Sequence, residues 1–508
     1  MASLASEPLF DVDEIQGNIL RGFSTNHLEL LGLKIGGAAP AKNWLSGLAD
    51  RRIASLAAVH DYRLRRSAND PATDTEVLLN VAFSKLGLEL VGVADPVVGD
   101  GLFNFPMGSF AAALGDRVVN GKPIDYVVGQ NRDNTPDVLF LIGCQNNAAL
   151  DAAVEDLQNQ AIAAGMRVIY KERGHLLPGE TEHFGYRDGI SEVGVRGLLS
   201  EDPVQPLTLR HVHEQDPQAA LFGRPGQPLV YPGQFVFGYP TQSIDPSTAG
   251  PVLDFAEWMR NGSLLVFRRL RQDVRAFRDF LAEKADEYST ATGEFITARQ
   301  LGARLVGRWE DGTPVTLSPD SEDAAIANDT MRLNHFAYGG AEAVTVTQDG
   351  NLTRTIPGHQ SDEAGLHCPF AAHVRKVNPR NLPTDQGLAS RTLQFQMLRR
   401  GIPYGPLYQE GEGKIDRGLL FLAYQTSFTR QFKILNNLWM NNQSAPERGN
   451  AGHDLLVGQN PPTESRFISF QDDAGNERVR LETMSRWVIS TGGAFLFSPS
   501  ISFLAGLA

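Results

Sequence analysis

The chain has 508 residues, of which 42% are hydrophobic and 21% are charged, so it is long enough to bury more than one hydrophobic core. Its formal net charge of -13 argues against nucleic acid as a partner, because phosphate binding requires a basic surface. With only two cysteines, the chain has no disulfide framework and no cysteine-rich zinc site.

The sequence contains no apolar run of about 18 residues, which a membrane-spanning helix would need. Its first ten residues also lack the basic stretch and apolar segment of a signal peptide. We therefore expect no membrane span and no signal peptide in this chain. The expected location is cytoplasmic by default, or secreted if the chain is a processed form.

The first part of the chain alternates short apolar runs with segments of helical spacing. The apolar runs predict strands at residues 28–34, 77–83, 136–144 and 166–170. Helical spacing predicts helices at 41–49, 86–91 and 148–163, the last with Asn147 as its N-cap. Apart from the short helix at 86–91, the order is strand, helix, strand, strand, helix, strand, which is typical of a ferredoxin-like unit.

Residues 174–262 are rich in glycine, proline and charge, and long irregular segments of this kind are usually functional or inserted. After this segment the elements resume. We expect strands at 263–267, 391–398 and 418–425, helices at 272–284 and 429–439, and a closing segment at 492–502 that packs against them. This order predicts a second copy of the same α+β unit.

The stretch His367-Cys-Pro-Phe-Ala-Ala-His373 is followed by Arg375, Lys376 and Arg380. One neutral imidazole beside several cations suits a metal that carries an anionic organic ring. The alternative is a surface loop with a solvated basic run, which is the usual meaning of such a charge pattern. Cys368 is a weaker ligand candidate than His373, since a free cysteine usually behaves as a small buried hydrophobe.

Two further motifs are Gly185-Tyr-Arg-Asp-Gly189 and Arg399-Arg-Gly-Ile-Pro-Tyr404. Together with the His373 stretch they resemble, in the same order, the motifs of the dye-decolorizing peroxidases, and the chain is similar to the long branch that includes the fungal enzymes. The resemblance covers almost the whole chain. It implies an α+β fold of two ferredoxin-like domains with antiparallel sheets, of the dimeric α+β barrel superfamily type. The expected domains are residues 1–192, ending in the Asp188 loop, and residues 193–508, which hold most of the haem contacts and carry an insertion at about 193–262.

Cleavage of a peroxide requires a proton to move between its two oxygens and a positive charge to stabilise the departing one. The resemblance gives the first role to Asp188 and the second to Arg399, and it makes His373 the iron ligand. Arg400 is the alternative cation. Because neighbouring residues of a strand point to opposite faces, only one of the two arginines can enter the pocket. Taken alone, Asp188 before a glycine would be an ordinary turn residue.

The resemblance implies one haem b per chain. Besides His373 and Arg399, it implies cofactor contacts from Gly189, Ile190, Ser191, Arg308, Asn378, Pro379 and Arg380, and the basic run after His373 adds Arg375. A metal-bound histidine normally donates its second ring N–H to an acceptor, and the family uses an acidic residue for this. The matching stretch 424–433 contains no acidic residue, so either the acceptor comes from elsewhere or the iron is less electron-rich.

The implied activity is that of a haem-dependent peroxidase, which reduces hydrogen peroxide and oxidises bulky dyes and phenolic compounds through a ferryl radical. Bulky dyes cannot enter the pocket, so electrons must reach it from the surface, and Tyr404 and Trp439 are the candidate relay residues. Both could instead be ordinary packing residues. Alternative functions are the release of iron from haem, or storage and delivery of haem. No nucleic acid or membrane partner is expected, and the chain could be a monomer or a homo-oligomer.

Overall fold

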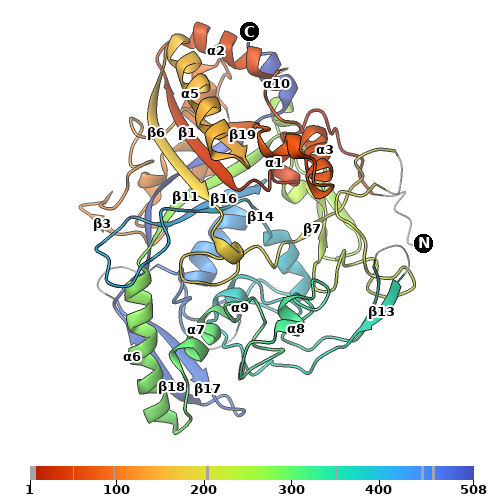
Figure 1. Cartoon of the computed structure of the whole chain (residues 1–508), viewed down its shortest axis with the longest axis vertical. Helices are drawn as coiled ribbons and strands as arrows, with labels where there is room; N and C mark the ends of the chain where they lie inside the picture. The colour runs from red at the N-terminus through yellow and green to blue at the C-terminus, as the bar shows by residue number, and fades with distance from the viewer. Residues whose placement is uncertain are drawn as a thin grey trace.

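The computed structural model describes residues 7–49, 51–96, 98–201, 205–348, 352–447, 451–459 and 464–508 (Figure 1). An antiparallel sheet that closes on itself organises these residues. Its nine strands run in the order β11-β19-β2-β5-β1-β6-β15-β16-β14, and β11 also pairs with β16. This extra pairing closes a ring of strands. The strands are β1 (His27–Ile35), β2 (Leu78–Phe83), β5 (Val138–Cys144), β6 (Met166–His175), β11 (Ser263–Gln272), β14 (Leu398–Arg399), β15 (Ile402–Tyr404), β16 (Gly418–Gln425) and β19 (Val488–Ser498).

Strands and helices from the first part of the chain build one half of this ring. Every residue of β2 and β5 is buried, because these apolar runs are covered on both faces. The helices here are α1 (Gly17–Leu20), α2 (Ala38–Ala49), α3 (Leu56–Ser67), α4 (Lys85–Leu90) and α5 (Asn147–Ala163). The predicted strands and helices are confirmed within a few residues, although α3 was not expected. Asn146, and not Asn147, caps α5, since its side chain accepts a hydrogen bond from the Ala149 N–H at 2.9 Å.

The second half contains β11, β14, β15, β16 and β19, together with α6 (Val274–Thr292) and α7 (Ala298–Val306). The expected strand at 391–398 is wrong, because a 3-10 helix occupies Ala389–Phe395. The alternating apolar pattern favoured a strand, but Thr392 and Gln396 donate side-chain hydrogen bonds to the carbonyls of Ala389 and Thr392. Such local bonds compete with sheet pairing. The expected helix at 429–439 forms as two π-helical turns, Phe428–Phe432 and Ile434–Met440.

The two halves of the ring meet at narrow joints. β2 pairs with β19 only through Phe83 and Phe497, and β6 pairs with β15 only through Gly174 and Tyr404. The boundary predicted at residue 192 falls between β6 and β11, and the ring contains strands from both sides of it. The fold class is therefore α+β with antiparallel strand pairing, as expected, and the two halves of the sheet are joined edge to edge.

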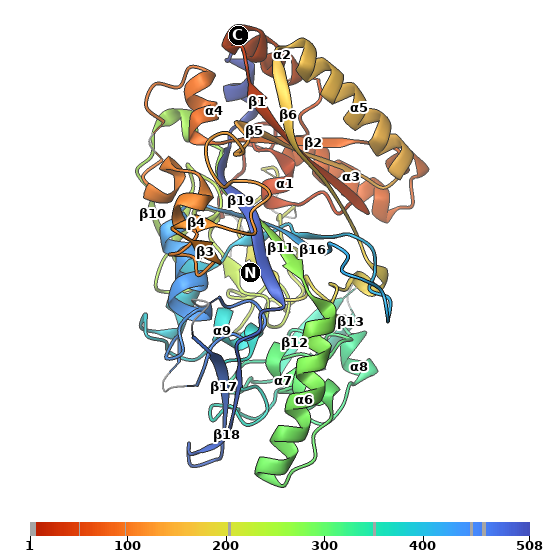
Figure 2. The same cartoon turned by 90° about the vertical axis from the view of Figure 1, so that its left-hand side faces the viewer.

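Smaller elements surround the ring. The segment between β6 and β11 is largely irregular, as expected, with short strands β7 (Gly194–Val195), β8 (Leu229–Val230), β9 (Pro240–Gln242) and β10 (Ala249–Val252). Besides several short 3-10 helices, the other elements are β3 (Val118–Val119), β4 (Lys122–Pro123), α8 (Ala324–Ala327), β12 (Val344–Gln348), β13 (Leu352–Ile356), α9 (His373–Val377), β17 (Arg466–Gln471), β18 (Glu477–Thr483) and α10 (Ile501–Ala505). Figures 1 and 2 show α2 and α5 at one end of the molecule and α6 with β17 and β18 at the other. None of the helices in the described part of the chain is long and apolar enough to span a membrane.

Candidate active site

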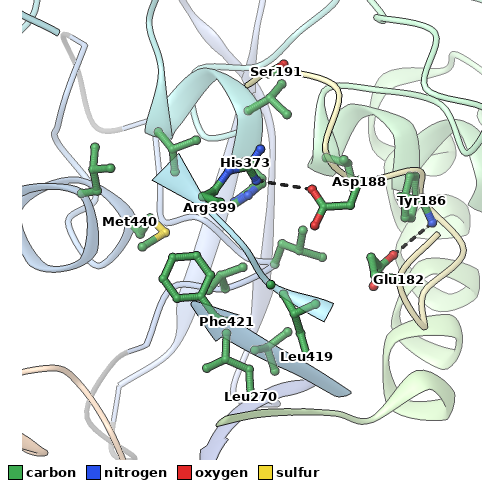
Figure 3. A pocket seen from close by; sticks show the side chains of 18 of the residues that line it. Glu182, Tyr186, Asp188, Ser191, Leu270, His373, Arg399, Leu419, Phe421 and Met440 are labelled. Atoms are coloured by element: carbon green, nitrogen blue, oxygen red, sulfur yellow. Dashed lines mark hydrogen bonds and ion pairs between the residues drawn. The ribbon is translucent and has the colours of Figure 1, made fainter. Parts of the chain in front are cut away.

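A cavity of about 280 Å³ lies where the second half of the sheet meets α9 and the loop that carries Asp188. One wall is apolar and the other carries ionisable groups. Figure 3 shows Leu270, Leu419, Phe421 and Met440 on the apolar wall, with Asp188 and Arg399 facing each other above them. The apolar wall comes from β11, β16 and the second π-helical turn, so the sheet itself supports this side of the cavity.

His373 begins α9 and lines the cavity. Its Nδ1 donates a hydrogen bond of 2.7 Å to Asp454 Oδ2, so Nε2 is the ring nitrogen left for a ligand. The Asp454 carboxylate is fully buried, and its Oδ1 accepts the backbone N–H groups of Leu456 and Val457 at 2.9 and 3.1 Å. Burial alone would lower the pKa of His373, but the neighbouring Asp454 carboxylate outweighs burial and raises this pKa. The imidazole is thus oriented, and its basicity is increased.

Asp454 supplies the acceptor that residues 424–433 lack, and it lies 81 positions after His373 in the sequence. Sequence reasoning left the acceptor open and did not name this residue. One signal could have identified it: Asp454 precedes the apolar run Leu455, Leu456 and Val457. A carboxylate next to a buried apolar run is itself buried only when it has a partner.

Asp188 and Arg399 form an ion pair on the opposite, polar wall. Arg399 Nη1 lies 3.3 Å from Asp188 Oδ1, and Arg399 Nη2 lies 3.1 Å from Glu192 Oε1. The loop fixes Asp188 through its backbone N–H, which donates to the Glu180 carbonyl at 3.1 Å, while the Gly189 N–H donates to Asp188 Oδ1 at 2.7 Å. Burial opposes the charge of Arg399, but the two carboxylates outweigh it and raise the pKa of the guanidinium. Arg399 is therefore held as a cation at the cavity.

The neighbouring Arg400 points away from this cavity. Its guanidinium donates to the carbonyls of Asn18 at 2.9 Å, Ile19 at 3.1 Å and Leu20 at 2.9 Å, which are the free carbonyls of α1. Arg399 and Arg400 therefore point to opposite sides, as expected for neighbouring residues, and Arg399 lies on the cavity side.

Two further arginines line the cavity without a carboxylate partner in the described part of the chain. Arg308 donates to the carbonyls of Gly312 and Leu333 at 2.8 and 2.9 Å, and to Ser191 Oγ at 2.9 Å. Arg380 donates to the Phe336 carbonyl at 2.7 Å. Burial, reinforced by the charge of Arg380, lowers the pKa of Arg308 to about 9, and burial lowers the pKa of Arg380 to about 10. Two neighbouring, desolvated guanidinium groups that lack a carboxylate partner favour the binding of an anionic group between them.

The residues at this cavity fit the haem that the resemblance implies. His373 offers one free ring nitrogen, and the two unpaired arginines suit the acidic side chains of the ring. Gly189 has a positive φ of +77°, and a Cβ atom added there would meet no atom within 4 Å, so this backbone borders open space. A flat ring can therefore approach the loop closely. Ile190, Ser191 and Asn378 also line the cavity, as expected.

The structure corrects the expected cofactor contact of Arg375, which does not line the cavity. Arg375 is fully buried and binds Glu447 through two hydrogen bonds of 2.8 and 2.7 Å. Its guanidinium also lies 4.4 Å from the ring centroids of both Tyr338 and Phe370. The reason is helical geometry, since a residue two positions after His373 on α9 projects from the other face. Pro379 is likewise absent from the cavity lining.

Tyr404 and Trp439 are both buried and neither lines the cavity. The Tyr404 hydroxyl lies 3.2 Å from Asp416 Oδ1, and Asp416 has a half-exposed side chain. Trp439 donates from Nε1 to Asp385 Oδ1 at 2.9 Å and packs against Phe395. The role of both residues as electron relays stays a prediction.

The chain is similar to known proteins over most of its length. A family described as "DyP dimeric alpha+beta barrel domain" matches residues 14–178, and one described as "Dyp-type peroxidase, C-terminal" matches residues 348–451. The dye-decolorizing peroxidase of Mycena epipterygia is 32% identical over 462 residues, which cover 86% of this chain and 77% of that protein.

Two solved structures are similar over nearly the full length. An ancestral D-type dye decolorizing peroxidase superposes with a TM-score of 0.79 at 28% identity, covering 98% of this chain and 99% of that chain. A dye-decolorizing peroxidase in complex with 2,6-dimethoxyphenol gives a TM-score of 0.75 at 28% identity, covering 98% and 100%.

The similarity to a protein of the alternative function is limited. A deferrochelatase of Yersinia pestis is 37% identical over 76 residues, which cover 15% of this chain and 15% of that protein. Among the proteins described above, each one that matches this chain over most of its length is a peroxidase. Because a relative of at least 30% identity and solved structures cover most of its length, this chain belongs to the dye-decolorizing peroxidase family and is a haem-dependent peroxidase.

Proposed function

We propose that the cavity binds one haem b per chain, with His373 Nε2 as the iron ligand and Arg308 and Arg380 as partners of the acidic side chains of the ring. The observation that carries this proposal is the hydrogen bond between His373 Nδ1 and the buried Asp454 carboxylate, which leaves Nε2 for the metal. The two arginines without a carboxylate partner in the described residues support the second assignment.

When bound, the haem supplies the iron centre at which peroxide is reduced. Asp188 takes a proton from the oxygen of peroxide that approaches the centre and returns it to the departing oxygen. Its hydrogen bonds to Arg399 and Gly189 in the described part of the chain both engage Oδ1, so Oδ2 is the oxygen that handles the proton. Arg399 supplies positive charge beside the departing oxygen.

We propose hydrogen peroxide, phenols and bulky dyes as the substrates. The phenol complex of a similar structure supports phenols as reductants. A dye too bulky to enter this cavity must transfer its electrons through the protein. Tyr404 and Trp439 are both relay candidates, because each is buried and contacts an exposed carboxylate, Asp416 for Tyr404 at 3.2 Å and Asp385 for Trp439 at 2.9 Å.

The test is an absorption spectrum of haem-loaded protein before and after one equivalent of peroxide, recorded for wild type, His373→Ala and Asp188→Asn. We expect His373→Ala to lose the haem band and Asp188→Asn to keep it. Asp188→Asn should slow the peroxide-induced shift by about 100-fold to 10,000-fold, since an amide cannot accept the proton.

Two variants serve as controls. Asp329→Asn removes a carboxylate that pairs with Arg354 at 2.6 Å, outside the cavity, and His367→Ala removes a histidine that does not line it. Both should behave as wild type. An unchanged haem band in His373→Ala would contradict the ligand assignment, and an unchanged rate in Asp188→Asn would contradict the proton transfer.

A further inference from the structure

A second cavity, of about 370 Å³, is lined by Arg400, which points away from the haem cavity that Arg399 faces. Its lining contains four arginines, Arg21, Arg63, Arg224 and Arg400. It contains a single carboxylate, Glu192. Arg21 follows α1, Arg63 belongs to α3, Arg224 precedes β8 and Arg400 follows β14. Figure 1 shows α1 and α3 side by side above β7, on the side of the molecule away from β3. Both halves of the chain thus contribute charge to one cavity.

In the described part of the chain, a single carboxylate of the cavity lining, Glu192, offsets the positive charge of its four arginines. Across the described ranges of the chain, Arg21, Arg63 and Arg224 form no ion pair. Glu192 is shared, because its Oε1 lies 3.1 Å from Arg399 Nη2 and its Oε2 lies 3.7 Å from Arg400 Nη1. The excess is local, since the whole chain carries a net charge of -13.

Three of these arginines also retain unused hydrogen-bond donors. Arg21 donates from Nη1 to the Leu207 carbonyl at 3.2 Å, while its buried Nε has no partner. Arg63 uses Nη1 for backbone carbonyls at 2.5 and 3.4 Å, and Arg224 reaches Gln227 at 3.4 Å. A guanidinium has five N–H donors, so most donors of these residues have no partner among the described residues and are free for a ligand.

The clustering is unfavourable without a counterion. Burial, together with the charges of Arg21 and Arg400, lowers the pKa of Arg63 to about 10. Burial and the charge of Arg400 likewise lower the pKa of Arg21, and burial lowers that of Arg224. Partly buried cations that repel one another are stabilised when an anion enters between them.

We propose that this cavity binds a small multivalent oxyanion through Arg21, Arg63 and Arg224, with Arg400 as a fixed neighbouring charge. The planar guanidinium group forms paired hydrogen bonds with phosphate, sulfate and carboxylate groups. Arg400 contributes mainly its positive charge, because its N–H groups already donate hydrogen bonds to the carbonyls of α1. The site is separate from the haem cavity, and the proposal does not depend on peroxidase activity.

The test is isothermal titration calorimetry of the haem-loaded protein with phosphate, sulfate and citrate at constant ionic strength. We expect one anion per chain in wild type and at least a tenfold weaker affinity in the double variant Arg63→Gln and Arg224→Gln. The matched control is Arg275→Gln with Arg278→Gln, which removes two exposed arginines of α6 and should leave the affinity unchanged.

The three probes separate the two possible sources of the anion. Binding of phosphate or sulfate as tight as that of citrate supports a free inorganic ion, whereas binding of citrate alone supports an organic polyanion. If wild type binds none of the three, or if the double variant binds as tightly as wild type, the proposal is wrong.

A second measurement applies if the double variant does not fold. The thermal unfolding temperature of wild type is compared in sodium phosphate and in sodium chloride at equal ionic strength. A ligand that binds only the folded state raises this temperature as its concentration rises. We expect a larger rise in wild type than in the single variant Arg224→Gln, because general exclusion of phosphate from the protein surface raises both temperatures alike, and an equal rise would overturn the proposal.

Discussion

The two sides of the haem cavity differ in how firmly their functional side chains are held. On the His373 side, the partner Asp454 is completely buried, and the bond between them is 2.7 Å long. On the Asp188 side, the side chains of Asp188 and Arg399 are 46% and 35% exposed, and they are 3.3 Å apart. A metal ligand requires one fixed orientation, whereas a proton carrier must reach both its substrate and water. The buried His373 side meets the first requirement, and the more exposed Asp188 side meets the second.

Replacement of Arg399 tests the exposed side and should give the largest effect after that of Asp188→Asn. We expect Arg399→Leu to lower the rate of the reaction with peroxide by about 100-fold to 1,000-fold, the usual cost of removing a group that stabilises developing charge. Arg399→Lys should recover part of this loss. Stopped-flow measurement of the peroxide reaction checks both variants.

The matched control for this prediction is Arg354→Leu, which breaks the ion pair with Asp329 away from the cavity. It should leave the peroxide rate unchanged. If Arg399→Leu reacts as fast as wild type, the exposed side of the cavity does not supply the charge.

Replacement of Asp454 tests the buried side. We expect Asp454→Asn to weaken haem affinity by about 10-fold to 100-fold, the usual cost of removing the partner of a metal ligand. The reduction potential of the bound iron should rise, because the imidazole becomes a weaker electron donor. Haem transfer to a scavenger protein and a redox titration measure the two quantities.

Asp385→Asn is the control for the buried side, because this residue binds Trp439 Nε1 outside the cavity lining. It should change neither the haem affinity nor the potential. A potential that does not move in Asp454→Asn would mean that Asp454 only packs against His373.

Glu182 gives the smallest expected effect, and it concerns the loop that carries Asp188. Its carboxylate accepts the N–H groups of Phe184 and Tyr186 at 2.9 and 3.0 Å, and burial raises its pKa to about 7. The folded protein therefore holds this proton more tightly than the unfolded chain does. Between about pH 4.5 and pH 7 the stability should fall as pH rises, by about 1.4 kcal/mol per unit from this group.

Thermal unfolding of wild type and Glu182→Gln across this pH range measures the contribution. Glutamine has the size of the carboxyl group but only one acceptor oxygen, so the variant keeps one of the two N–H hydrogen bonds and should be less stable at every pH, and it should lose this part of the pH dependence. An identical pH profile for the two proteins would show that Glu182 does not titrate in this range.

Local patterns in the sequence predicted most strands of the ring. The apolar runs of β2, β5 and β16 are buried because each is too hydrophobic to face water, and this property needs no knowledge of the partner strand. The segment 391–398 failed for a local reason, since the side chains of Thr392 and Gln396 bond nearby carbonyls. Its alternating pattern alone could not reveal this competition.

Motifs likewise identified part of the site. His373, Asp188 and Arg399 all line one cavity, and strand geometry alone indicated that Arg399 and Arg400 would point apart. Arg375 was assigned to the cofactor because it is close to His373 in sequence, and the structure gives it Glu447 as its partner. Proximity in sequence does not determine which face of a helix a side chain occupies.

The sequence by itself determined the family, the alternation of buried strands and helices, and the three motifs that meet at the cavity, because these depend on residue types over short spans. Only the tertiary structure decided that Asp454 binds His373, and that arginines from both halves share a second cavity. Both features join residues far apart in the chain, and their energies depend on burial and on distances that exist only after the sheet has closed.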